Sequence, residues 1–272
     1  MEKRFAKRLV IVLIYLILLA LIAFVVYSAM KPKETCFDKI KNQKEEDVDC
    51  GGTCVPCKKI VTQDLTVTDK GLVESGRQGT YDFWAVVSNP NNSYGTKLFQ
   101  YEIKIKNSSG SVVSERNGTG FILPGEHKYI VENNLESDAV SNSLEFNILK
   151  TEWVEFNNYY EKPNLKIVNK NYNPISSGAG FSEAIGLLKN ESPYDFSIIK
   201  IEVILKDASG KIVALNSTEM RTVKSGEERE FRAFWPVSFP GDVQNVETQA
   251  DVNIFESDAI IKTVTNPGNP SK

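Results

Sequence analysis

The chain has 272 residues, of which 41% are hydrophobic and 25% are charged, and its formal net charge is −3 at pH 7. Residues 1–8 hold four basic residues and one acidic residue, and residues 9–30 hold no charge, which leaves −6 on residues 31–272. A mildly acidic surface without a basic stripe argues against nucleic acid and anionic headgroups as ligands.

The first 30 residues predict a membrane anchor. The basic tail MEKRFAKR (1–8) precedes 22 uncharged residues (9–30), and a helix of that length spans the ~30 Å hydrocarbon core of a bilayer. This run is longer than the core of a signal peptide, so we expect an uncleaved signal anchor, although Ser28 and Ala29 leave cleavage open. Because basic residues stay on the cytoplasmic side, the later domains should lie outside the cytoplasm. The reverse orientation is the alternative.

All the cysteines lie in the short polar segment 31–60 that follows the apolar run. Cys36, Cys50, Cys54 and Cys57 have the spacing C-x13-C-x3-C-x2-C. In an oxidising compartment an even number of cysteines in a loop-like segment predicts disulfides, here two that would form a rigid collar. Cys54 and Cys57 should each pair with a more distant cysteine, and the connectivity stays open.

Two metal sites are alternatives to a purely disulfide-bonded collar. Four thiolates would suit a structural zinc ion, but only if the cysteines were reduced. A calcium ion would use the closely spaced oxygen ligands of the same segment. These are Asp38, Asn42, Glu45, Asp47 and Asp49. Apart from this calcium alternative, the sequence predicts no cofactor.

The same segment resembles a cysteine motif, C-x-D-G-I-x-N-x-x-E-x-D-V-D-C-G-G-x-C-x-x-C, of surface and secreted proteins of bacteria and archaea. The match is carried mainly by "DVDCGGTCVPC", and Lys39 stands where the motif has glycine. The resemblance implies a location outside the cytoplasm rather than an activity.

Beyond the collar the chain repeats itself with an offset of 100 residues. "LFQYEIKIKNSSGSVV" (98–113) aligns with "IIKIEVILKDASGKIV" (198–213), and "DLTVTDK" (64–70) aligns with "NLKIVNK" (164–170). The repeat predicts two domains, 61–160 and 163–262, with a break near Pro163. A disordered tail, 263–272, should follow.

Each copy has the periodicity of β-strands. Tyr101, Ile103 and Ile105 alternate with polar residues, and Ile201, Val203 and Leu205 do so in the second copy, which is typical of half-buried strands. The turns "NSSG" and "DASG" then predict hairpins. We therefore expect an all-β fold of two tandem immunoglobulin/fibronectin-like β-sandwiches arranged in line, each with about seven strands.

Both copies also resemble FxLYD domains and the related cell-adhesion sandwiches. The segments that carry the resemblance are 85–126 and 186–227, each with an Asn-containing turn, an alternating strand, a hairpin and a Gly-Glu turn. The resemblance implies an interaction role, because such domains occur in anchored surface proteins.

The sequence contains none of the catalytic motifs that would predict an enzyme. His127 is the only histidine and lies in a turn, and the nucleophile elbow, the zinc-protease motif and the phosphate-binding loops do not occur. We therefore expect a protein that is not an enzyme.

Two sets of residues are candidates for surface roles. An exposed tryptophan could contact a sugar or a protein, although burial in a sandwich core is the expected role. The tryptophans are Trp84, Trp153 and Trp235. Five sequons predict glycosylation sites if the host glycosylates, at Asn91, Asn107, Asn117, Asn190 and Asn216.

Together these features predict a single-pass membrane protein that presents tandem β-sandwiches at the cell surface for binding or adhesion. Its ligand would be a surface protein or a polysaccharide. The alternative is a structural or accessory subunit of a membrane protein complex in the cell envelope.

Overall fold

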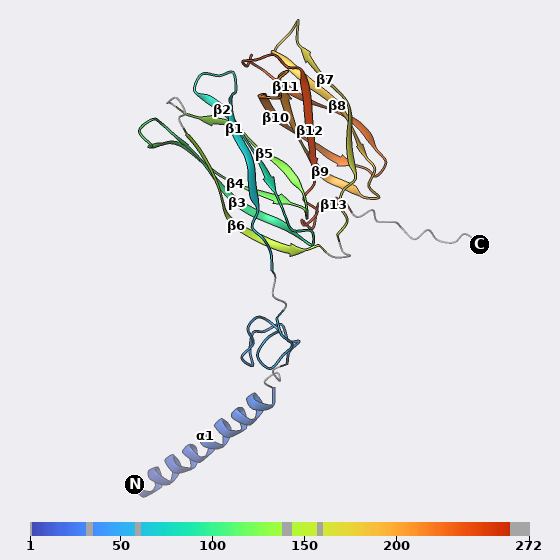
Figure 1. Ribbon diagram of the computed structural model, residues 1–272. Coiled ribbons are helices and arrows are strands. Elements are labelled where there is room, and N and C mark those ends of the chain that lie inside the picture. The colour runs from blue at the N-terminus through green and yellow to red at the C-terminus, as the bar shows by residue number, and fades with distance from the viewer. Residues whose placement is uncertain (1, 31–34, 58–60, 138–142, 157–159, 262–272) are drawn as a thin grey trace, which may run out of the picture. The chain divides into compact units, whose positions relative to one another are not determined.

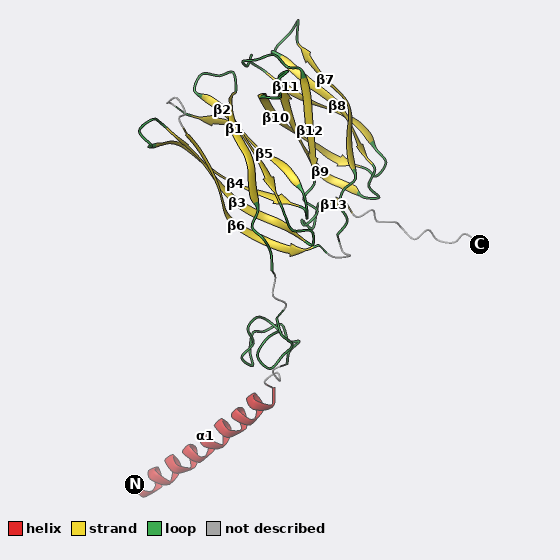
Figure 2. Ribbon diagram, viewed as in Figure 1, coloured by secondary structure: helices red, strands yellow, loops and turns green. Residues whose placement is uncertain are grey.

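A computed structural model of the chain describes residues 2–30, 35–57, 61–137, 143–156 and 160–261 (Figure 1). It divides into two compact units, residues 1–61 and residues 62–272. The expected tail 263–272 lies outside the described residues. The strands dominate, so the protein is all-β apart from its N-terminal helix (Figure 2).

The first unit contains the helix α1 (Glu2–Met30) and a Cys-rich segment. The helix begins within the basic tail rather than after it, and its described side chains, residues 12–28, are all exposed. Among the described residues, no helix combines the length and the hydropathy of a membrane span.

Six strands form the first sandwich of the second unit. One sheet has the order β1-β2-β5 and the other has the order β4-β3-β6, with antiparallel pairing throughout. The strands are β1 (Thr66–Glu74), β2 (Thr80–Ser88), β3 (Tyr94–Lys106), β4 (Val112–Ile122), β5 (His127–Glu136) and β6 (Ser143–Glu155). Phe83, Phe99 and Ile103 are completely buried between the two sheets.

The second sandwich repeats this arrangement with sheets of the order β11-β8-β7 and β10-β9-β12, where β13 also pairs with β9. Its strands are β7 (Leu165–Pro174), β8 (Ser182–Asn190), β9 (Asp195–Lys206), β10 (Ile212–Val223), β11 (Glu228–Trp235), β12 (Asn245–Asp251) and β13 (Ile260–Ile261). Phe196, Ile199 and Leu188 are completely buried in its core. The expectation of about seven strands is too high for the described part of the first copy, which has six.

The repeat extends to the hydrogen bonds of individual turns. Asn107 Oδ1 accepts bonds from the backbone N–H groups of Ser109 and Ser111, and Asp207 Oδ1 accepts the same bonds from Ser209 and Lys211. Both side chains stabilise the turn between two consecutive, paired strands, so the predicted hairpins are confirmed.

A buried asparagine ends the second strand of each copy in the same way. Asn89, which follows β2, donates Nδ2 to the carbonyl groups of Tyr94 and Leu123, at 2.7 and 3.0 Å. Asn190, which ends β8, donates to Tyr194 and Lys224, at 2.8 and 3.0 Å. Each side chain therefore ties its own turn to a loop more than 30 residues later in the chain.

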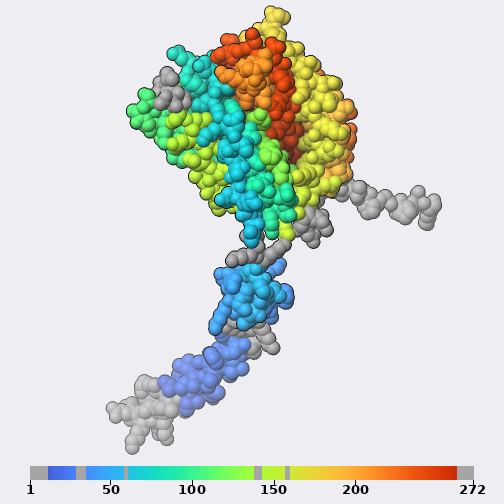
Figure 3. All heavy atoms as spheres, viewed as in Figure 1, coloured from blue at the N-terminus to red at the C-terminus, as the bar shows by residue number. Residues whose placement is uncertain are grey.

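The two sandwiches are not arranged in line. They lie side by side (Figure 3), and the sheet β1-β2-β5 of the first packs against the sheet β10-β9-β12 of the second. Strand β9 is consequently buried on both faces from Ile201 to Leu205. The expected half-buried alternation is wrong for this strand and correct for β3.

Candidate functional site

The four cysteines of the Cys-rich segment form two disulfides, Cys36–Cys54 and Cys50–Cys57. The predicted disulfides are therefore confirmed, and Cys54 and Cys57 each pair with a more distant cysteine. No cysteine is left as a free thiol, so the zinc alternative is wrong because it needs thiolates.

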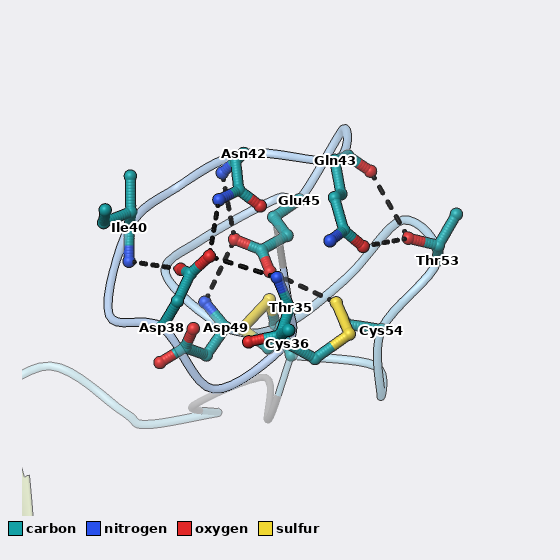
Figure 4. The surroundings of a disulfide bond; sticks show 12 residues. Thr35, Cys36, Asp38, Ile40, Asn42, Gln43, Glu45, Asp49, Thr53 and Cys54 are labelled. Atoms are coloured by element: carbon teal, nitrogen blue, oxygen red, sulfur yellow. Dashed lines mark hydrogen bonds between the residues drawn. A yellow bond between two sulfur atoms is a disulfide. The ribbon is translucent and has the colours of Figure 1, made fainter. Parts of the chain in front are cut away.

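The acidic residues of this segment hold the backbone in its tight turns (Figure 4). Glu45 is buried, and its Oε2 accepts hydrogen bonds from the N–H groups of Asn42 and Asp49. Asp49 accepts from the N–H of Lys39, whose φ of 61° is the left-handed conformation that glycine adopts most easily. A hydrogen bond from the Asn42 side chain, together with backbone N–H groups, lowers the pKa of Asp38.

This arrangement explains the acidic residues without a metal ion. The carboxylates of Asp38, Glu45 and Asp49 already face N–H donors, and a Ca²⁺ ion would have to displace those bonds. Within the described residues, the only group of three potential metal-ligating side chains is Cys36, Glu45 and Cys54, and its two sulfurs are oxidised to a disulfide. Among the described residues, the buried Oδ1 of Asn42 has no hydrogen-bond donor. Calcium binding by this segment stays a prediction.

We expect no thiol to react when the protein is alkylated from unreduced membranes under denaturing conditions, and four to react after reduction. Replacing Cys50 with serine should release one reactive thiol, that of Cys57, because its partner is gone. Mass spectrometry of the alkylated protein measures both numbers. Labelling of Cys36 or Cys54 in this variant would contradict the connectivity.

The three tryptophans are all buried or half-buried. Trp235 is 5% exposed and donates Nε1 to the carbonyl group of Leu215 at 3.1 Å. Trp153 packs against the core of the first sandwich, and Trp84 lies between the two sandwiches. Core packing therefore accounts for them better than ligand contact does.

The sequons differ in how accessible they are in the folded chain. Asn190 is 1% exposed and its Nδ2 donates to backbone carbonyl groups, so the folded protein has no room for a glycan there. Asn91 and Asn216 also donate Nδ2 to the backbone, and Asn107 shapes its turn. Asn117, on β4, is exposed.

The contact between the sandwiches, which we call the seam, has an apolar centre. Trp84 and Val131 of the first sandwich pack near Ile204 and Leu215 of the second, and Val73, Tyr129 and Ile212 complete this cluster. Trp84 fits closely because Gly71 lies beside its ring, where a Cβ atom would come within 2.8 Å of Nε1. Removing this apolar surface from water stabilises the contact between the sandwiches.

A glutamine of the second sandwich completes the edge of the first. Gln249, on β12, accepts the N–H of Tyr129 at 2.7 Å through Oε1 and donates Nε2 to the carbonyl group of the same residue at 3.1 Å. Both backbone groups of Tyr129 on this side of β5 are thus satisfied by one side chain. The amide orientation is fixed, since only Oε1 can accept from the N–H group.

Charged groups are buried along the seam beside this glutamine. Lys128 Nζ lies 3.2 Å from Asp251 Oδ2, and their side chains are 4% and 6% exposed. The same ammonium lies 3.7 Å from the centre of the Phe121 ring. Glu202, 2% exposed, pairs with Lys200, and burial raises its pKa despite that partner. Buried charges of this kind persist only when they are paired and hydrogen-bonded.

Two adjoining hollows, of about 480 and 380 Å³, open along one end of the seam. We call them the seam groove. They lie where the β1–β2 hairpin meets the loop after β11, and the hairpin approaches so closely that a Cβ on Gly76 would be 2.0 Å from the carbonyl oxygen of Ser238. Both sandwiches contribute to the lining, with apolar residues and a charged rim. These residues include Leu72, Tyr81, Ile212 and Pro240, and Glu74, Arg77 and Lys211 at the rim.

The sequence reasoning identified none of the charged residues of the seam. One pattern would have indicated the contact: Ile204 and Leu215 stand where the first copy has Lys104 and Glu115. An apolar residue at a position that should face water indicates a covered face.

Comparisons with known proteins add little to this geometry. No family model matches the chain, and no curated protein matches it. Among the solved structures that are similar is one titled "Crystal structure of calcium binding domain CBD12 of CALX1.1". It is 10% identical, with a TM-score of 0.22, over 70% of this chain and 79% of that chain. At this TM-score the similarity carries no argument about function.

Proposed function

We propose that this protein is a membrane-anchored cell-surface protein without catalytic activity, which binds a surface protein or a polysaccharide through the seam groove. The observation that carries the proposal is the packing of the two sandwiches through a buried seam. Residues of both sandwiches line the groove at one end of this seam. Ligand sites form preferentially between domains, where two rigid bodies provide walls and a few polar groups.

The location rests on three features. The 22 uncharged residues 9–30 follow a basic tail, and the chain is helical there. The two disulfides favour an oxidising compartment. The membrane would then hold the N-terminus on the cytoplasmic side and residues 31–272 outside.

We further infer that each sandwich is immunoglobulin-like and related to FxLYD domains. The sheet orders β1-β2-β5 and β4-β3-β6 correspond to the A-B-E and C′-C-F pattern of such folds. The second sandwich has the same order. Many cell-surface domains have this sandwich architecture, so the assignment agrees with an interaction role.

Photo-crosslinking in intact cells tests the proposal. A photoreactive amino acid at Gln78, at the rim of the seam groove, should form an adduct with protein or wall polymer outside the cell. The same amino acid at Ser109, in the exposed turn after β3, is the matched control and should give none. Arg77→Glu should reduce the yield from Gln78, because it reverses a charge at the rim.

Three results would count against the proposal. Equal adducts from both positions would show nonspecific contact, and no adduct from Gln78 would remove the groove as the binding site. Adducts formed only by probes within α1, always with the same membrane protein, would favour the alternative of an accessory subunit in an envelope complex.

A further inference from the structure

The Lys128–Asp251 pair has a geometry that permits more than an ion pair. An amine and a carboxyl group are held 3.2 Å apart in the seam, and each side chain is more than nine-tenths buried. The Phe121 ring covers the amine. Keeping two ions in such a place is unfavourable before their attraction is counted.

Condensation of the two groups requires an amine without its extra proton and a carboxyl group that has gained one. One proton passing from Nζ to the carboxylate yields a neutral amine beside a carboxylic acid. A desolvated, neutral lysine is a nucleophile, and the acid carbon is an electrophile within its reach.

We propose that Lys128 and Asp251 condense to an amide bond that joins the two sandwiches covalently. The Nζ–Cγ bond forms, and the bond from Cγ to the carboxyl oxygen that becomes the leaving group breaks. Two of the three ammonium protons leave with that oxygen as water, and the third stays on the amide nitrogen. Both charges disappear, and the reaction needs no oxidant, reductant or other reactant.

Gln249 is placed to assist this condensation. Its Nε2 donates to Asp251 Oδ2 at 2.6 Å, and its orientation is fixed by Tyr129. As Nζ adds to Cγ, negative charge develops on the oxygen that Gln249 holds, and a donor already in position stabilises it. Oδ2 then becomes the amide oxygen, and the other carboxyl oxygen leaves.

Glu126 provides a nearby group that can carry the proton. It ends the turn before β5, accepts the N–H of Leu123 at 2.7 Å, and interacts electrostatically with both Lys128 and Asp251. Burial is the main cause of its raised pKa. A carboxyl group of this kind can take a proton from the attacking nitrogen and return it to the leaving oxygen. Glu126 is a positioning and proton-transfer residue, not the nucleophile.

The second copy lacks the lysine that this reaction needs. Arg229 aligns with Lys128 in the repeat, and a guanidinium stays protonated in proteins. Its nitrogens donate to the carbonyl groups of Arg221 and Thr222 and pair with Glu227. The amide bond is therefore a property of the seam rather than of the repeat.

The intact mass of the full-length protein, purified in detergent and denatured, tests this proposal directly. Two disulfides remove about 4 Da from the sequence mass, and the amide bond would remove a further 18 Da, about one water. Trypsin should then yield residues 117–150, uncut at Lys128, linked to residues 233–262.

Lys128→Arg is the matched control, because it keeps the positive charge but cannot form the amide. Its mass should therefore show the loss from the disulfides but not the loss of about 18 Da from the amide bond. Asp251→Asn should lose about 17 Da instead, since ammonia is then the leaving group. Glu126→Gln and Gln249→Ala should form the bond more slowly. An unmodified wild-type mass after prolonged incubation would overturn the proposal, as would the same loss of mass in Lys128→Arg.

Discussion

Replacing Ile204 with lysine will destabilise the protein by about 4 kcal/mol, because it places an unpaired charge in the apolar centre of the seam. Ile204 is completely buried, on the face of β9 that packs near Trp84 and Val131. The variant should unfold at lower denaturant, and the fluorescence of Trp84 should shift towards that of a solvated indole. Equilibrium unfolding followed by circular dichroism measures the change in the free energy of unfolding.

The matched control is Lys104→Ile, which makes the reverse exchange at the equivalent position of the first copy. Lys104 lies on the outer face of β3 and pairs with Glu102 at 2.7 Å. Because Lys104 is only half-buried and its ion pair lies at the surface, this substitution should leave the free energy of unfolding close to that of the wild type. If the two variants lose similar stability, the seam is not the reason for the loss at Ile204.

This pair of positions also explains what could be predicted from the sequence and what could not. The alternation of Tyr101, Ile103 and Ile105 indicates a strand with one buried face, and β3 has that structure. The same alternation in the second copy is interrupted by Ile204, where the first copy has a lysine. Strand periodicity identifies the strand, but only this interruption indicates that β9 is covered on both faces.

The Cys-rich segment was predictable to a similar extent. An even number of cysteines in a polar segment indicated disulfides, and the two bonds are present. Which cysteines pair depends on turns that the spacing does not specify. The acidic residues there resemble metal ligands in sequence, whereas in the structure Glu45 and Asp49 accept backbone N–H groups.

The polar part of the seam could not be predicted, because its partners are far apart in the chain. Gln249 satisfies the backbone of Tyr129, 120 residues earlier, and Asp251 meets Lys128. Nothing local distinguishes these side chains from solvated polar residues on a strand. Only the arrangement of the sandwiches side by side brings them together.

Replacing Asn190 with alanine will cost about 3 kcal/mol, since it leaves several buried backbone groups without partners. The Nδ2 of Asn190 donates to the carbonyl groups of Tyr194 and Lys224, and its Oδ1 accepts the N–H of Ser192 at 3.1 Å. Asn89→Ala should have a similar effect in the first copy, where the same bonds recur. Chemical denaturation of both variants, compared with Asn117→Ala at an exposed site, measures the losses.

The aspartate variant separates hydrogen bonding from packing at this position. Asn190→Asp preserves the volume and the acceptor for Ser192 but turns a carboxylate oxygen towards two carbonyl oxygens. It should therefore be at least as unstable as Asn190→Ala near neutral pH, because a buried acceptor facing acceptors is unpaired and repelled. Protonation of the new carboxyl group supplies one O–H donor, so some stability should return as the pH falls. If Asn190→Asp is as stable as the wild type at neutral pH, the side chain acts by filling space and not as a donor.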